Sequence, residues 1–203
     1  MGFFVYPRRG LVLFMVLAGA WLGGCQVTPP VPTRTFIVRQ SLLDLTGLVP
    51  PAPVEDVAVS WAHPRGWEQL VPKKTALYAH QQWRSPSGAT GVGVVRIRMP
   101  LALSANTIIW FARNEYVKSS RDQKDGKLIG QWSDDLGRVW FEAENNKYHV
   151  LGYAVTRGRD AWIVYSGWRT GLPPEPTEIS IARRSAETVV PGVTGVVASS
   201  ERK

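Results

Sequence analysis

Two turn dipeptides constrain the fold of this chain more than any other feature. Asn145-Asn146 and Gly158-Arg159 each separate runs in which apolar and polar residues alternate. Asparagine tolerates the positive φ of a type I′ turn, and glycine suits the first central position of a type II′ turn. The spacing therefore predicts three consecutive antiparallel strands over residues 138–144, 147–156 and 160–168.

The rest of the C-terminal three quarters predicts further strands and two helices. Apolar alternation and turn residues predict strands over residues 57–61, 75–84, 89–99 and 127–132. Ser104 is expected to cap a helix that runs to residue 119, and Thr177 a helix over 178–190 that Pro191 ends. This order predicts an α+β domain over residues 54–191, with helices packed on a mostly antiparallel sheet.

The N-terminal segment has the parts of an export signal. Residues 1–9 carry two arginines and no acid, and residues 10–22 are apolar. A helix needs about 20 apolar residues to cross a hydrocarbon core, so the apolar run predicts a signal peptide rather than a membrane span. Gly23 and Gly24 then precede Cys25, the only cysteine, so the sequence offers no disulfide.

The stretch Leu22-Gly23-Gly24-Cys25 resembles the lipobox of bacterial lipoproteins. The resemblance implies that residues 1–24 are removed and that Cys25 is acylated, which would attach the chain to membrane lipid on the periplasmic side of the cell envelope. Several acyl chains, at about 0.8 kcal/mol per buried methylene, make such an attachment effectively permanent. In such lipoproteins, an aspartate directly after the cysteine favours retention in the inner membrane. This chain has Gln26 at that position, so the outer membrane is the favoured location. The alternative for Cys25 is a lone buried thiol after a hydrophobic helix.

Proline clusters at 29–32 and 50–53 predict an extended, semi-rigid chain. Residues 25–53 are therefore expected to form a tether between the anchor and the domain. Within them, residues 36–48 are apolar enough for a strand or a helix, and the pattern does not decide between the two. Residues 192–203 are small and polar, which predicts a flexible tail.

The charge balance is basic but dispersed. The chain carries a net charge of +8, and loss of residues 1–24 leaves 22 basic and 16 acidic residues, or +6. An excess of this size suits contact with anionic lipid or acidic polymers. The basic residues are interspersed with acids, however, which indicates a solvated surface rather than a nucleic-acid interface.

The domain resembles the PsbP/Mog1 superfamily, which includes the DcrB-type envelope lipoproteins. The resemblance rests on the turn His63-Pro64-Arg65-Gly66-Trp67, on residues 158–168 and on the helix over 178–190. It implies a small binding or assembly domain that recognises an envelope protein and catalyses no reaction.

One arrangement on the predicted sheet suits catalysis. If Asn145-Asn146 forms a two-residue turn, Glu142 faces His149, and the next turn places His149 opposite Trp168 with Ser166 nearby on the same face. Glu142, His149 and Ser166 together would suit a lipid-anchored hydrolase. The competing interpretation is a structural Glu–His pair, which is favoured because Ser166 lies in a strand and not in a Gly-x-Ser-x-Gly elbow.

No motif predicts a metal or a cofactor. The three histidines lack ligand spacing such as His-Glu-x-x-His, and Asp134-Asp135-x-Gly137 is typical of a turn. Gly91 and Gly93 lie in a predicted strand, which indicates a bulge or close packing. Eight of the nine tryptophans follow Cys25, and we expect them in the core rather than in a carbohydrate or peptide groove.

Overall fold

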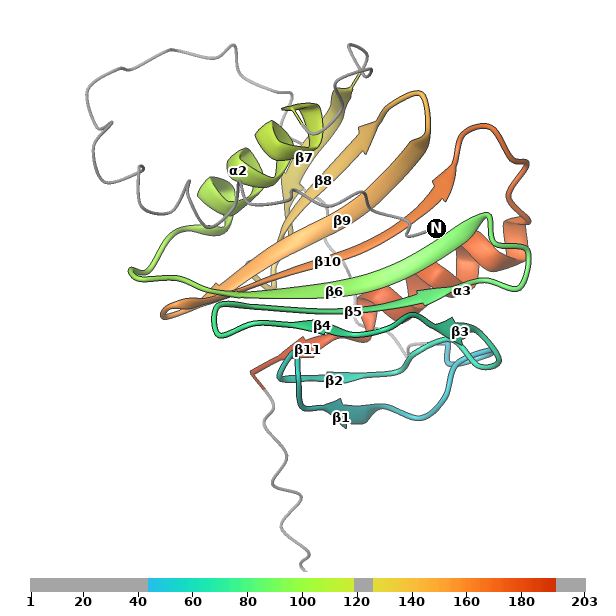
Figure 1. Cartoon of the computed structure of the whole chain (residues 1–203), viewed down its shortest axis with the longest axis horizontal. Helices are drawn as coiled ribbons and strands as arrows, with labels where there is room; N and C mark the ends of the chain where they lie inside the picture. Colours follow the sequence, from blue (N-terminus) through green and yellow to red (C-terminus); the bar gives the residue numbers. More distant parts are fainter. Residues whose placement is uncertain (1–43, 119–125, 193–203) are drawn as a thin grey trace, which may run out of the picture.

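Antiparallel pairing organises the described part of the chain into two sheets with two packed helices, which confirms the α+β prediction (Figure 1). The structure is a computed structural model that describes residues 44–118 and 126–192. The large sheet contains β3 (Glu68–Gln69), β4 (Lys73–Lys74), β5 (Tyr78–Arg84), β6 (Thr90–Arg98), β7 (Lys127–Ser133), β8 (Val139–Glu144), β9 (Tyr148–Arg157) and β10 (Asp160–Arg169). The small sheet contains β1 (Ala52–Val54), β2 (Val59–Trp61) and β11 (Val190–Pro191), and the helices are α2 (Ala105–Lys118) and α3 (Pro176–Glu187).

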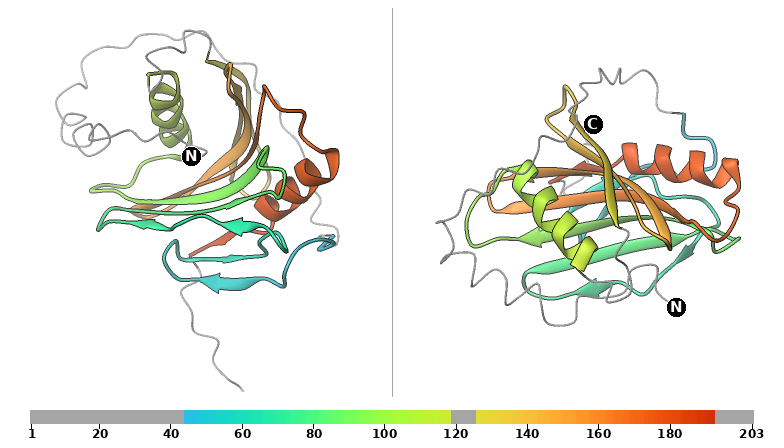
Figure 2. Two further views of the ribbon diagram at one scale, coloured as in Figure 1. Left: turned by 45° about the vertical axis from the view of Figure 1, so that its right-hand side comes forward. Right: turned by 90° about the horizontal axis from the view of Figure 1, so that it is seen from above.

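The two helices lie on opposite faces of the large sheet (Figure 2). The strand order is β3-β5-β6-β10-β9-β8-β7, with β4 also paired to β5. The sheet curves around α2, so α2 lies on its concave face, and α3 covers the other face together with the small sheet (Figure 2). We call these the α2 face and the α3 face. Because side chains alternate along each strand, every second residue points to the same one of these faces.

Local sequence signals located most of the elements. The predicted hairpin forms as β5 and β6, and the predicted edge strand over 127–132 forms as β7. The Ser104 hydroxyl accepts a hydrogen bond from the Thr107 amide at 3.2 Å, which confirms the predicted cap of α2. Residues Asp134 to Gly137 form the predicted turn, with Gly137 at φ +71°.

The turn between β8 and β9 lies one residue later than predicted. The Asn145 side-chain oxygen accepts hydrogen bonds from the amides of Lys147 and Tyr148, each at 2.8 Å, and this holds Asn145 at the end of the strand. The central turn residues are therefore Asn146 and Lys147. As a result Glu144, and not Glu142, stands directly opposite His149, and the predicted register of this hairpin is wrong.

The second turn of the meander is as predicted. β9 and β10 pair around Gly158-Arg159, and His149 stands directly opposite Trp168. Gly158 has φ +59°, a backbone conformation that residues other than glycine rarely adopt.

The predicted cap of α3 is wrong. The N-cap residue is Glu175, which makes no side-chain capping bond. Pro176 occupies the start of the helix, where a backbone N–H would have no partner within the helix, so the lack of one in proline costs nothing. The helix ends at Glu187, and Pro191 belongs to β11, which pairs with β2.

The folded part of the chain begins before the predicted start at residue 54. β1 pairs with β2, the Leu48 side chain is buried, and the Asp44 carboxylate forms an ion pair with Arg184 of α3. Several of the last ten residues of the predicted 25–53 tether therefore contact the domain. Of the predicted 192–203 tail, Gly192 donates a backbone hydrogen bond to Ala58 at 2.9 Å, and residues 193–203, like Cys25, lie outside the described residues.

Four tryptophans form much of the core on the α3 face, as expected from the sequence, whereas Trp110 of α2 is exposed. The buried rings of Trp61, Trp83, Trp140 and Trp162 belong to one cluster with Ala182 and Ala186 of α3. A second cluster joins α2 to the other face near the ends of β6, β9 and β10. Aromatic rings of this size bury on the order of 150–250 Å² each, so they supply much of the hydrophobic stabilisation.

Candidate functional site

The structure brings Glu142 and His149 together on the α3 face, with Glu144 as a third member. The Nε2 atom of His149 lies 2.7 Å from a Glu142 oxygen, and its Nδ1 atom lies 3.4 Å from a Glu144 oxygen. Glu144 in turn contacts the Lys127 ammonium at 2.7 Å, and this hydrogen bond, with the Lys127 charge, lowers the pKa of Glu144. Both imidazole nitrogens of His149 are therefore engaged by carboxylates.

Ser166 shares this face but is not joined to His149. Its side chain is 2% exposed, and its hydroxyl donates to the Leu151 carbonyl at 3.4 Å. The neighbour that contacts the imidazole is Trp168, whose ring stacks on that of His149 with centroids 4.2 Å apart and planes at 12°. The Arg183 guanidinium of α3 lies over the Trp168 ring, 5.7 Å from its centroid. The cluster is packed and internally paired, which fits the structural interpretation of the Glu–His pair.

A buried ionic cluster lies at the other end of β8. The Asp134 carboxylate accepts hydrogen bonds from the Arg138 guanidinium at 2.6 Å and from the Trp140 indole at 2.8 Å. Burial alone would raise the pKa of Asp134, but these hydrogen bonds and the Arg138 charge outweigh it and hold the pKa below its ordinary value. The arrangement closes the loop between β7 and β8, and we assign it a structural role.

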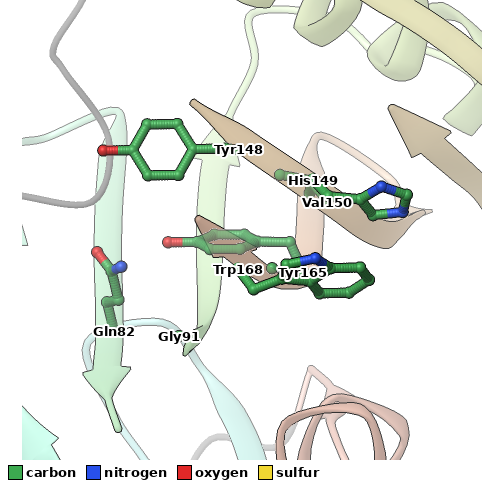
Figure 3. A pocket seen from close by; sticks show the side chains of 8 residues that line it. Gln82, Gly91, Tyr148, His149, Val150, Tyr165 and Trp168 are labelled. Carbon is green, nitrogen blue, oxygen red and sulfur yellow. The ribbon is translucent and has the colours of Figure 1, made fainter. Parts of the chain in front are cut away.

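A small recess lies on the α2 face, toward the ends of β6 and β10 that are remote from α2 (Figure 3). Its lining includes Gln82, Gly91, Tyr148, Val150, Tyr165 and Gly167. Gly91 and Gly167 are direct cross-strand partners. Neither has a side chain, so the backbone of β6 and β10 lines the recess at these two positions. The lining is almost entirely apolar, and the recess has room for little more than a water molecule.

One polar group in this recess is unsatisfied. The Gln82 side chain is 6% exposed, and its Nε2 atom is buried and has no hydrogen-bond partner among the described residues. Gln81, the next residue in β5, points to the other face and accepts a hydrogen bond from Gln69 at 2.9 Å. Gln82 therefore differs from Gln81 in carrying an amide nitrogen that is fully buried without a partner.

A neutral pair flanks Gln82. The His80 Nε2 atom lies 2.6 Å from the Tyr165 hydroxyl oxygen. Burial, reinforced by the Lys73 charge, lowers the pKa of His80 to about 4, and burial raises the pKa of Tyr165 well above its ordinary value. Both side chains are therefore uncharged near pH 7, whereas an efficient general acid or base has a pKa close to the working pH. This pair suits uncharged recognition better than proton transfer.

The close packing predicted from the strand glycines occurs at Gly93. A Cβ atom there would lie 2.4 Å from the Tyr165 hydroxyl oxygen, so the ring of Tyr165 lies directly across β6. The sequence signal that could have located the recess was the polar pair Gln81-Gln82 in the middle of a strand near glycine-rich β6. Sequence reasoning found the glycines but not Gln82, because the unsatisfied amide depends on strands far apart in the chain.

Comparison with models of protein families gives no match, and comparison with curated proteins gives none either. Among residues 44–118 and 126–192, no group of three or more His, Cys, Asp or Glu side chains is arranged to hold a metal ion. In the same residues, no helix has both the length and the apolar character to cross a membrane.

Proposed function

We propose that this protein is a cell-envelope lipoprotein, anchored through acylated Cys25 and facing the periplasm, whose PsbP/Mog1-like domain binds an envelope protein without catalysing a reaction. The leader, the lipobox-like stretch and the prolines after it support the anchor. The observed antiparallel sheet with packed helices is consistent with the superfamily resemblance. The outer membrane is the favoured location, because no aspartate follows Cys25.

The observation that carries the binding role is the unsatisfied Gln82 amide in the recess on the α2 face. Leaving a buried donor without a partner costs about 1–3 kcal/mol, and native structures rarely retain one. An acceptor would recover this free energy only after a local rearrangement of the recess, because the Gln82 Nε2 atom is fully buried. By contrast, the Glu142, His149 and Ser166 side chains already bond to groups of the same face, which favours binding over the hydrolase alternative.

Labelling with palmitate tests the anchor. Cells expressing the full chain should incorporate palmitate into it, and Cys25→Ser should abolish the label. Ser166→Ala, which leaves the cysteine intact, serves as the matched control and should label normally. Labelling that survives in Cys25→Ser would refute the lipoprotein proposal.

Site-directed crosslinking in the intact envelope tests the binding role. A photoreactive residue at Tyr148, beside the recess, should capture a discrete protein, whereas the same residue at the highly exposed Val71 of the β3–β4 segment should not. Capture should require irradiation and should decline when Gln82 is replaced by Met. Equal capture from both positions would show that contact at the recess is nonspecific.

A further inference from the structure

We propose that the domain docks on anionic phospholipid of the membrane that holds its acyl anchor, through the end of the large sheet that carries the β9–β10 turn. The inference rests on the proposed lipoprotein function and adds the orientation of the domain. The strands of the large sheet stand on the membrane by this end. The recess on the α2 face lies toward the other end, where an envelope protein can reach it.

Three segments that are far apart in the sequence meet at the docking end (Figure 1). The Arg98 amide donates a hydrogen bond to the Leu77 carbonyl at 2.9 Å, and the Met99 amide donates one to the Arg159 carbonyl at 2.8 Å. The β4–β5 turn, the end of β6 and the β9–β10 turn therefore lie side by side. We call this surface the basic end and define it by Leu77, Arg98, Leu101, Arg157 and Arg159.

The basic end carries positive charge that no acid of the domain neutralises. Arg98, Arg157 and Arg159 are exposed, and none of their guanidinium groups forms an ion pair or a hydrogen bond with the residues that the structure describes. The acid within the three segments, Asp160, is already paired with Arg96 at 3.1 Å. An anionic surface can therefore approach three cationic groups together, and each is worth about fivefold in affinity for such a surface.

The opposite end of the sheet differs in its charges. There Arg84 pairs with Glu68, and Lys127 pairs with Glu144. Two of its basic residues are therefore neutralised by acids of the domain, whereas the three arginines of the basic end are not. The domain is polar along its strands, and the electrostatic attraction to an anionic membrane turns the basic end toward the lipid.

Two leucines add apolar contact beside the arginines. Leu77 is 44% exposed and Leu101 is 57% exposed. A soluble polyanion would use the arginines but not the leucines. A phospholipid surface uses both, because its headgroups are anionic and the exposed apolar side chains can enter the boundary between headgroups and acyl chains. The combination favours a membrane over an acidic protein or polymer.

The chain between the anchor and the domain is long enough for this orientation. The described part begins at Asp44, so residues 25–43 separate it from the acylated cysteine. At about 3.1 Å per residue, an extended chain of this length reaches about 60 Å, about twice the length of the nine-residue strand β6. The anchor can therefore reach past either end of the sheet, and the charges select the basic end.

Fluorescence of the acylated chain in vesicles tests the proposal. Acylation consumes the thiol of Cys25, so the cysteine of a Leu101→Cys chain is the only one that a thiol-reactive fluorophore can label. An environment-sensitive label at position 101 should shift its emission to the blue in vesicles of phosphatidylcholine mixed with phosphatidylglycerol, and not in phosphatidylcholine alone. The same label in Lys147→Cys, at the turn of the opposite end, should report water in both kinds of vesicle.

Two charge variants of the labelled Leu101→Cys chain provide the matched comparison. Arg159→Gln should lower the ratio of docked to free domain about fivefold, whereas Lys147→Gln, which removes the same charge from the opposite turn, should leave it unchanged. Salt at about 1 M, which shortens the screening length to about 3 Å, should release the domain. Circular dichroism checks folding, and the comparison of the two kinds of vesicle decides the matter even if Arg159→Gln does not fold.

Three results would overturn the docking surface: a label at position 101 that reports water in both kinds of vesicle, an equal response in both, or an equal effect of Arg159→Gln and Lys147→Gln. Palmitate labelling of the same preparation separates this failure from failure of the anchor. An acylated chain whose label at position 101 stays in water keeps its anchor and loses the docking surface. A chain that takes up no palmitate loses both.

Discussion

The most quantitative prediction concerns His80. Burial lowers its pKa from 6.5 to about 4 in the folded chain, whereas in the unfolded chain it has the ordinary value. Between these two values the unfolded state binds the proton and the folded state does not. The contribution of His80 to stability is therefore complete above about pH 6.5 and is lost as the pH falls toward about 4. At about pH 5 the loss is about 2 kcal/mol.

Urea denaturation of the full chain and of His80→Gln in detergent measures this effect. Glutamine cannot titrate, so only the unmodified chain loses this contribution as the pH falls. Between about pH 7.5 and about pH 5, the unmodified chain should therefore lose about 2 kcal/mol of stability relative to His80→Gln. Other titrating groups cancel in this difference. An NMR titration of the imidazole signal lost in His80→Gln gives an independent check. Parallel pH profiles, or an imidazole that titrates near its ordinary value, would refute the argument that burial with Tyr165 keeps His80 neutral.

Three other substitutions test the packing. Asp134→Asn should destabilise the chain by about 3–5 kcal/mol, because it leaves the buried Arg138 charge without its carboxylate, and a denaturation midpoint close to that of the unmodified chain would contradict this. Gly93→Ala should cost about 1–3 kcal/mol, since the added carbon would overlap Tyr165, which calorimetry can detect as a lower Tm. Ser166→Ala should change the free energy of unfolding by less than about 1 kcal/mol, because it removes only one long hydrogen bond; a larger loss would mean that the hydroxyl does more than this contact.

Local chemistry made much of the fold predictable. The hairpin of β5 and β6, the meander of β8 to β10 and the cap of α2 follow from turn residues, alternation and a capping serine. These signals act within a few residues, so they are readable without knowledge of the rest of the molecule. The register at Asn145 was wrong because an asparagine can either occupy a turn position or bond to the turn from its flank, and the dipeptide is compatible with both.

The candidate site was less predictable. The contact between Glu142 and His149 was expected, yet it arises from a diagonal pairing in a different register, and Ser166 is bonded to the backbone instead. Gln82 had no distinguishing feature beside Gln81 in the sequence, because their difference lies in which face of the sheet each one points to.

The sequence by itself therefore determined the longer elements and their order, and it holds the pattern ending at Cys25 that predicts an export signal, since each depends on residues that are neighbours along the chain. It did not reveal the short strands β1, β3, β4 and β11. The tertiary structure alone decided what is buried and what is paired. The contact of His80 with Tyr165 spans 85 positions, and the Gly91–Gly167 pair of the recess exists only because β6 and β10 lie side by side. Burial and hydrogen-bond satisfaction depend on such distant neighbours, and they set the charge of His80 and the free donor of Gln82.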